Sequence, residues 1–164
     1  MNEERDNSKE TGKSALKHRR KLQWLLLLLA LGMAIRGWVW MPVFITGNSM
    51  LPTLHAGQIA GVNKLIYLFR LPQRGEVVAV WTGDDLMIKR IIGLPGEEIA
   101  ERDGLFSVNG MTLAEPYVQF RDHGKIDPGR VGLDRFVVAG DNRLQTLIAI
   151  VNRKRIIGRL RLDH

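Results

Sequence analysis

Residues 85–96 read DLMIKRIIGLPG and predict a strand that ends in a Leu-Pro-Gly turn. Successive side chains of a strand point to opposite faces. Lys89 therefore shares one face with Met87 and Ile91, while Ile88 and Arg90 share the other. An ammonium among apolar groups is disfavoured by burial, so a lysine placed this way can serve as a neutral general base. Considered alone, Lys89 fits an exposed lysine at a strand edge better than a buried base, because most lysines are exposed.

Further short β-rich runs lie on both sides of this stretch. They are VFIT (43–46), QIAGVNKLIYLF (58–69), EVVAVW (76–81), LFSVNG (105–110), RFVVAG (135–140) and RIIGRL (155–160). Asn109-Gly110 is a strong hairpin signal, and the polar, Gly-rich segment 119–134 predicts a surface loop. No long amphipathic helical pattern interrupts the runs, so we predict a mostly β domain over residues 43–164.

An apolar segment precedes the β-rich part. Residues 22–35, LQWLLLLLALGMAI, number 14, whereas a spanning helix needs about 20. Adding residues 36–40 brings the segment near spanning length if the Arg36 guanidinium reaches the interface beside Trp38 and Trp40. A cleaved signal peptide is disfavoured, because no small-x-small cleavage pattern follows Ile35. A buried core helix is also disfavoured, because the leucines leave no polar face at helical spacing. We therefore predict a transmembrane anchor at 22–42.

The charge of +7 is concentrated at the two ends of the chain. Residues 1–21 contribute +3 and residues 153–164 contribute +4, while residues 22–152 hold twelve basic and twelve acidic side chains. A nucleic-acid-binding surface would need a basic face on the folded body, so we expect no nucleic-acid partner. The basic side chains before residue 22 favour a cytoplasmic tail over 1–21 and an extracytoplasmic domain after the anchor.

A serine follows the anchor closely, in the segment TGNSMLPTLHAG (46–57). A serine near a proline turn commonly serves as a turn hydroxyl, but a hydroxyl beside an unprotonated lysine is a known design for a nucleophile. Ser49 and Lys89 could form that pair. His55 fits a turn residue better than the base of a triad. The chain has no cysteine and no pair of histidines at ligand spacing, so we expect neither a metal nor another cofactor.

Taken together, these segments resemble the bacterial type I signal peptidases, membrane-anchored serine proteases with a Ser-Lys dyad. The resemblance covers nearly everything after Lys21, and its motifs occur in the family's order. They are GNSMLPTLHAG (47–57), RGEVVAVW (74–81), IKRIIGLPGEEI (88–99), VVAGDNR (137–143) and RKRIIGRL (153–160). The resemblance implies a β-barrel or β-sandwich catalytic domain on a single N-terminal transmembrane helix.

The resemblance also implies roles for particular residues. Ser49 matches the nucleophile and Lys89 the general base. A shallow apolar pocket that admits a P1 alanine would be lined by Ile45, Met50, Leu54, Met87 and Ile88. Arg90 and Asp141 match structural positions of their motifs.

Two departures from the family pattern stand out. Gly47 occupies a position where some members carry a serine that helps to hold the oxyanion, which leaves backbone N–H groups, chiefly that of Ser49, for this task. Thr146 keeps a hydroxyl where the family's serine orients the lysine. Where the family continues with Asp-Ser-Arg, this chain has Ile148, Ala149 and Ile150. The ion pair that the Asp and Arg of the family pattern would form is therefore absent from this segment.

The function implied is a serine endopeptidase of the bacterial plasma membrane that removes signal peptides from secretory preproteins after Ala-x-Ala sites. Its expected partners are preproteins and membrane lipid. The altered segment leaves open a non-cutting relative that binds or assembles surface proteins. A self-cleaving repressor of the Ser-Lys superfamily is disfavoured, because no Ala-Gly pair precedes Ser49 and the N-terminal part leaves no room for a DNA-binding motif.

Overall fold

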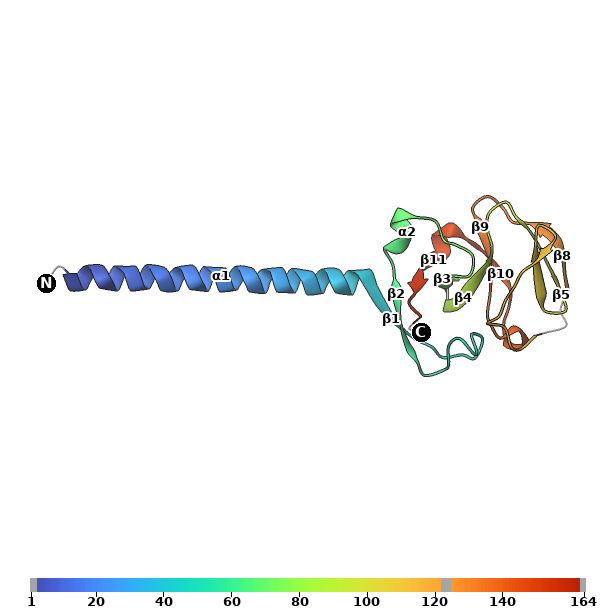
Figure 1. Cartoon of the computed structure of the whole chain (residues 1–164), viewed down its shortest axis with the longest axis horizontal. Coiled ribbons are helices and arrows are strands. Elements are labelled where there is room, and N and C mark those ends of the chain that lie inside the picture. The colour runs from blue at the N-terminus through green and yellow to red at the C-terminus, as the bar shows by residue number, and fades with distance from the viewer. Residues whose placement is uncertain (1–2, 122–124, 163–164) are drawn as a thin grey trace. The chain divides into compact units, whose positions relative to one another are not determined.

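The computed structural model describes residues 3–121 and 125–162, and the chain divides into two units, Met1–Val39 and Trp40–His164. The first unit contains one helix, α1 (Glu3–Val39), which includes most of the predicted tail (Figure 1). Among the described residues, no helix combines the length and the apolar run that crossing a bilayer requires. Helix α1 ends at Val39, so residues 40–42 of the predicted anchor belong to a strand instead.

The second unit is mostly β, as predicted, and contains two antiparallel sheets (Figure 1). The larger sheet has the order β1-β2-β11-β3-β4-β9-β10. Its strands are β1 (Trp40–Phe44), β2 (Ile59–Asn63), β3 (Val77–Trp81), β4 (Leu86–Gly93), β9 (Arg135–Ala139), β10 (Ala149–Asn152) and β11 (Ile156–Leu160). Its hydrogen-bonded order runs from β1 to β10 without closing over the described residues, so the barrel form of the prediction is wrong.

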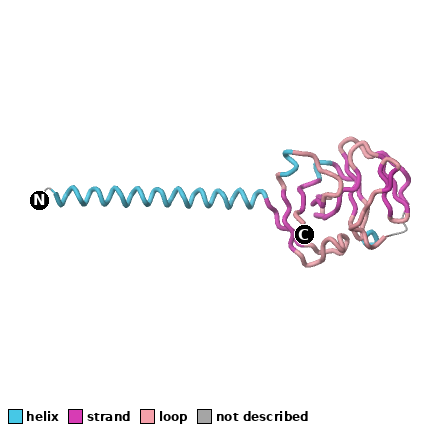
Figure 2. The backbone as a smooth tube through the Cα atoms, viewed as in Figure 1, coloured by secondary structure: helices cyan, strands magenta, loops and turns pink. Residues whose placement is uncertain are grey.

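The smaller sheet has the order β7-β6-β5-β8. Its strands are β5 (Glu98–Arg102), β6 (Leu105–Val108), β7 (Met111–Thr112) and β8 (Lys125–Arg130). Three short helical turns complete the unit: α2 (Ile66–Phe69), η1 (Arg143–Gln145) and η2 (Arg153–Arg155). Long loops, pink in Figure 2, join several of these elements, and one of them spans residues 45–58 between β1 and β2.

Local sequence patterns predicted part of this arrangement. The hairpin at Asn109-Gly110 is present, with positive φ at both residues (50° and 80°), as a two-residue loop of this kind requires. Two expectations were wrong. The predicted surface loop 119–134 contains β8, and the run 58–69 forms β2 followed by α2. In both segments pairing or packing partners distant in sequence decide the backbone, which local composition does not show.

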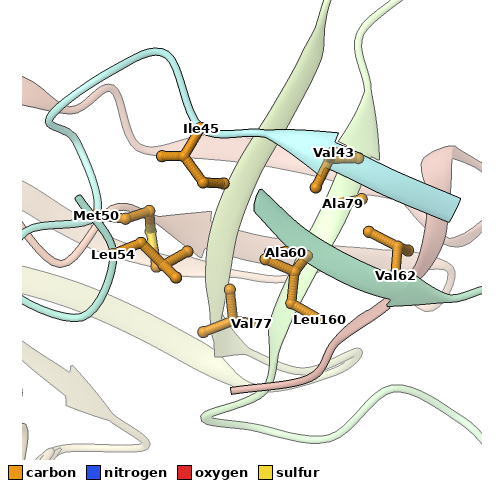
Figure 3. Packing of buried hydrophobic residues seen from close by; sticks show 9 residues of the cluster. All are labelled: Val43, Ile45, Met50, Leu54, Ala60, Val62, Val77, Ala79 and Leu160. Carbon is orange, nitrogen blue, oxygen red and sulfur yellow. The ribbon is translucent and has the colours of Figure 1, made fainter. Parts of the chain in front are cut away.

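The apolar core fixes the loop between β1 and β2. Ile45, Met50 and Leu54 are buried in one cluster with residues of β1, β2, β3 and β11 (Figure 3). The loop also closes on itself, because the Ile45 N–H donates to the Gln58 carbonyl at 2.9 Å and the Gly57 N–H donates to the Ile45 carbonyl at 2.7 Å. Apolar anchors on both sides of Ser49 thus hold the serine loop against the large sheet.

Candidate active site

Ser49 and Lys89 are neighbours in space although they are 40 positions apart in sequence. The Lys89 Nζ lies 3.1 Å from the Ser49 Oγ, within hydrogen-bond distance. Ser49 is half-buried in the loop after β1, and Lys89 projects from the centre of β4 with 6% of its surface exposed. The strand-edge alternative for Lys89 is therefore wrong, because this lysine is buried in the middle of the large sheet.

Thr146 completes the surroundings of the lysine. The Lys89 Nζ donates to the Thr146 Oγ1 at 2.9 Å, and the Gly140 N–H donates to the same oxygen at 2.9 Å. The Thr146 hydroxyl in turn donates to the Leu147 carbonyl at 3.2 Å. A neutral amine has two N–H donors and one lone pair, so donation to Thr146 leaves the lone pair able to accept the Ser49 proton.

The environment favours the neutral form of Lys89. Burial lowers the pKa of Lys89, and the negative charge of Asp141 opposes this effect without reversing it. A lysine with a lowered pKa is unprotonated in a larger fraction of molecules near neutral pH than an ordinary lysine. The pair can therefore act chemically as a hydroxyl nucleophile with an adjacent amine base.

Arg90 and Asp141 form a buried ion pair beside the dyad. The Arg90 Nε donates to Asp141 Oδ1 at 2.8 Å and its Nη2 donates to Oδ2 at 2.6 Å. The Thr53 hydroxyl, in the serine loop, donates to the same carboxylate, and Arg90 also donates to the Gly75 carbonyl at 2.7 Å. The pair thereby joins the serine loop, the lysine strand and the turn after β9.

The turn after β9 holds the serine loop through two residues that the sequence analysis did not single out. The Asn142 N–H donates to the Ser49 carbonyl at 3.0 Å, and its side-chain amide donates to the Asn48 carbonyl at 3.1 Å. A Cβ on Gly140 would lie 2.2 Å from the Ser49 carbonyl oxygen and 2.6 Å from the Thr146 Oγ1. Gly140 therefore permits the serine loop and Thr146 to approach each other. Gly140 and Asn142 both belong to the motif VVAGDNR, which was the sequence signal that could have indicated them.

A second buried ion pair supports the same turn. Arg143 donates to both carboxylate oxygens of Glu115, at 3.1 and 2.5 Å, and its Nε donates to the Gly140 carbonyl at 2.9 Å. The guanidinium lies 4.6 Å from the centre of the Phe106 ring, which brings the small sheet into the contact. Sequence reasoning missed Glu115, because nothing local relates it to a residue 28 positions away.

The predicted pocket residues are mostly brought together. Ile45, Met50 and Leu54 are buried in one cluster (Figure 3). Ile88 is partly buried and packs against this cluster. Met87 is half-exposed and lies on the opposite face of β4 from Ile88. Ile88 and Ile91 belong to different clusters, as the predicted alternation requires.

The structure shows the surroundings of the two positions at which the sequence departs from the family pattern, Gly47 and the apolar segment after Thr146. No heavy atom lies within 4 Å of the position that a Cβ on Gly47 would occupy, so the glycine is not imposed by crowding. In the apolar segment after Thr146, Ile148 and Ala149 pack against core clusters, while Ile150 is exposed on the edge strand β10. Apolar packing of Ile148 and Ala149 therefore takes the place of the ion pair of the family pattern.

The remaining candidates lie apart from this chemistry. His55 is exposed, and its N–H donates to the Gln58 side chain at 2.9 Å, consistent with a turn residue. Within residues 3–121 and 125–162, no group of three His, Cys, Asp or Glu side chains could hold a metal ion.

Comparisons with known proteins agree with this geometry. Residues 18–162 match the family described as signal peptidase, peptidase S26. Signal peptidase I T of Bacillus subtilis (strain 168) is 30% identical over 96% of this chain and 92% of its own length. Signal peptidase I of Leptolyngbya laminosa is 36% identical over 82% of this chain and 72% of its own length.

A solved structure of a signal peptidase I from Enterococcus faecalis V583 is 25% identical, with a TM-score of 0.49 over 56% of this chain and 98% of that one. The family match alone covers most of the sequence, from within α1 to the residues after β11. The chain therefore belongs to the signal peptidase family, peptidase S26, and is a serine endopeptidase.

Proposed function

We propose that this protein removes N-terminal signal peptides from secretory preproteins, cleaving after Ala-x-Ala sites. The observation that carries the proposal is the 3.1 Å distance between the Ser49 Oγ and the Nζ of a buried lysine. These are the two side chains that the family resemblance assigns to the nucleophile and the base. Curated relatives over nearly the whole chain carry the name signal peptidase I, which supports this substrate class.

In the proposed mechanism, neutral Lys89 accepts the Ser49 hydroxyl proton while the Ser49 oxygen attacks the carbonyl carbon of the P1 residue. The Ser49 backbone N–H stabilises the oxyanion, and Gly47 contributes no side-chain donor. The protonated lysine then gives its proton to the leaving amine as the peptide bond breaks. A water molecule, deprotonated by Lys89, hydrolyses the acyl-enzyme and restores the serine. Thr146 orients the amine throughout by accepting one of its N–H groups.

The same proposal includes the substrate pocket. Ile45, Met50 and Leu54 of the serine loop cluster with Ile88 of β4, and Met87 lies on the same strand as Lys89. Small apolar side chains would fit against such a surface, and bulky ones would require core residues to move. An alanine at P1 satisfies this condition.

We place the enzyme in the bacterial plasma membrane as a single-pass protein. Residues 1–21 would lie in the cytoplasm, residues 22–42 would anchor the chain, and residues 43–164 would face outward. The apolar run over 22–35 and the basic side chains before it support this orientation. Ser49 lies nine residues after Trp40 in the sequence. That proximity would put the hydroxyl near the point where a preprotein leaves the bilayer.

The test is cleavage of a preprotein with an Ala-x-Ala site by the detergent-solubilised full chain. We expect cleavage after the second alanine, loss of activity in Ser49→Ala and Lys89→Ala, and loss of cleavage when the P1 alanine of the substrate is replaced by phenylalanine. Ser107→Ala and Lys64→Ala, which lie outside the dyad and its hydrogen bonds, are the matched controls and should retain activity. A folded wild type that cuts none of several preproteins up to alkaline pH would refute the proposal.

A further inference from the structure

A pocket of about 560 Å³ lies in the second unit. Neither member of the dyad lines it, and Thr146 does not line it either. Its walls come from the start of β1, the end of β2, the segment before β3 and the end of β11. The lining residues are Trp40, Asn63, Ile66, Gln73, Arg74, Gly75, Glu76, Val77, Arg159, Leu160, Arg161 and Leu162. The volume is within the range of pockets that bind small molecules.

The polar side of this pocket is dominated by guanidinium groups. Arg74, Arg159 and Arg161 line it together with one carboxylate, that of Glu76. The Glu76 carboxylate accepts hydrogen bonds from Tyr67 and the Gln73 N–H, both at 2.9 Å, and from the Arg70 guanidinium. Hydrogen bonds, chiefly from Arg70, lower the pKa of Glu76 against the opposing effect of burial, so this carboxylate is ionised and already satisfied within the protein.

Arg159 is the guanidinium best placed to contact a ligand. Its Nη1 is 3.5 Å from Glu76 Oε1, which is longer than a direct hydrogen bond of good geometry, and 49% of its side chain is exposed. Arg74, in contrast, is engaged by Glu97 and the Ile92 carbonyl. Arginine is suited to a phosphate because its planar group donates two parallel hydrogen bonds.

The other side of the pocket and its surroundings are apolar. Trp40, Val77, Leu160 and Leu162 line the pocket, and Ile66 of α2 adds to them. Next to Ile66, three apolar side chains are exposed: Leu68 (72%), Phe69 (85%) and Leu71 (69%). Trp40 and Ile66 line the pocket, and the exposed leucine and phenylalanine side chains follow Ile66 in the sequence. Such residues are typical of surfaces that enter the interface of a membrane.

We propose that this pocket binds the phosphodiester headgroup of an anionic membrane lipid, with Arg159 contacting the phosphate and Trp40 packing against the glycerol region. The lipid is favoured over a soluble anion because apolar walls and an exposed apolar segment adjoin the arginines. Trp40 also follows directly on Val39, the last residue of α1. The inference rests on the membrane location given under the proposed function, and it adds a lipid site distinct from the peptide-cleaving centre.

The test titrates the full chain, in a nonionic detergent, with three probes. They are dihexanoyl-phosphatidylglycerol, dihexanoyl-phosphatidylcholine and inorganic phosphate, and binding is measured by calorimetry. We expect the anionic lipid to bind at least tenfold more tightly than the zwitterionic one, and its affinity to fall as salt is raised. Arg159→Gln should lower this affinity at least tenfold and Arg159→Lys by less, because a lysine keeps the charge but loses the planar fork.

Arg102→Gln is the matched control, because Arg102 is exposed on β5 and does not line the pocket. It should bind the anionic lipid within twofold of the wild type, and thermal melts should show that each variant is folded. Equal binding of the two lipids, or unchanged binding in both Arg159 variants, would overturn the proposal. Displacement of the lipid by inorganic phosphate at equal concentration would identify a free-anion site instead.

Cleavage of a preprotein by the same preparations separates this inference from the proposed function. A wild type that cuts the preprotein but binds neither lipid selectively refutes the lipid site alone. A wild type that binds the anionic lipid selectively but cuts no preprotein refutes the proposed function alone.

Discussion

The Nζ of Lys89 lies 3.1 Å from the Oγ of Ser49, and the same nitrogen donates to the Thr146 hydroxyl at 2.9 Å. This arrangement gives the lysine a fixed acceptor for one N–H and directs the nitrogen toward the serine. Burial adds to the effect by lowering the pKa of the amine. The geometry and the electrostatics of the site therefore support the same proposed role.

The lowered pKa of Lys89 predicts how activity depends on pH. Only the neutral amine can accept the serine proton, so kcat/KM should rise with pH and level off at an apparent pKa below the usual lysine value of about 10.4. The measurement is a pH–rate profile on a preprotein or peptide substrate. A profile that still rises in proportion to hydroxide beyond pH 10 would contradict the role of Lys89 as a base with a lowered pKa.

The same shift predicts how stability depends on pH. Between the lowered folded-state pKa and about 10.4, the unfolded chain binds the Lys89 proton and the folded chain does not. The free energy of unfolding should therefore increase as pH rises through this window, and this increase should be lost as pH falls toward the folded-state pKa. Urea unfolding of wild type and Lys89→Met at several pH values isolates it; parallel pH dependences would contradict the prediction.

Replacing Gly140 by alanine should impair the enzyme strongly. A Cβ at this position would lie 2.2 Å from the Ser49 carbonyl oxygen and 2.6 Å from the Thr146 Oγ1, so the serine loop or Thr146 must move. Because a displacement of about 1 Å in a catalytic group can reduce a rate 10²-fold, we expect kcat/KM to fall by about that factor or more. Gly129→Ala is the control, since its Cβ would meet no atom closer than 3.9 Å.

Thr146→Val should reduce kcat more than it affects substrate binding. The valine keeps the shape of the side chain but removes the acceptor of the Lys89 and Gly140 N–H groups. An unsatisfied buried donor costs about 1–3 kcal/mol, so we expect a loss of about ten- to a hundredfold in kcat. Thr146→Ser should recover most of the rate. A valine variant as active as the wild type would show that the hydroxyl does not orient the lysine.

Gly47→Ser tests whether a side-chain hydroxyl at position 47 can act as an additional oxyanion donor. The site has room for the side chain, because no heavy atom lies within 4 Å of the new Cβ. One oxyanion donor is worth about 10²–10³ in rate where it is already part of the site, so we expect a gain in kcat of up to about 10²-fold. Single-turnover kinetics would measure it, and a lower kcat would argue against an oxyanion next to residue 47.

The buried pair Arg90–Asp141 predicts a non-additive effect on stability. Removing one partner, as in Asp141→Leu, leaves a buried charge and should cost about 3–5 kcal/mol in the free energy of unfolding. The double variant Arg90→Met/Asp141→Leu should lose less than the sum of the two single variants, because no unpaired charge remains. Urea denaturation of the four proteins provides the cycle, and additive losses would contradict the prediction.

Sequence patterns predicted the strands that carry the dyad better than those of the small sheet. Strand β4 was predicted at its observed residues because apolar side chains flank Lys89 and Arg90 in a short run bounded by turn residues. Strand β8 was predicted as a loop, because its residues KIDPGR resemble turn sequences and their pairing with β5 is not visible locally. Propensity describes the segment itself, while a sheet is stabilised by partners elsewhere in the chain.

The mostly β class, the family motifs and the two side chains proposed for catalysis could be predicted from the sequence, because they depend on residue type, alternation and order along the chain. The tertiary structure decided the distance between Ser49 and Lys89, the burial that lowers the lysine pKa, and the contacts of Gly140, Glu115 and Arg143 behind them. It also decided that Arg159 and Trp40 line one pocket. The physical reason is that desolvation, close approach and charge pairing arise between segments that only folding brings together.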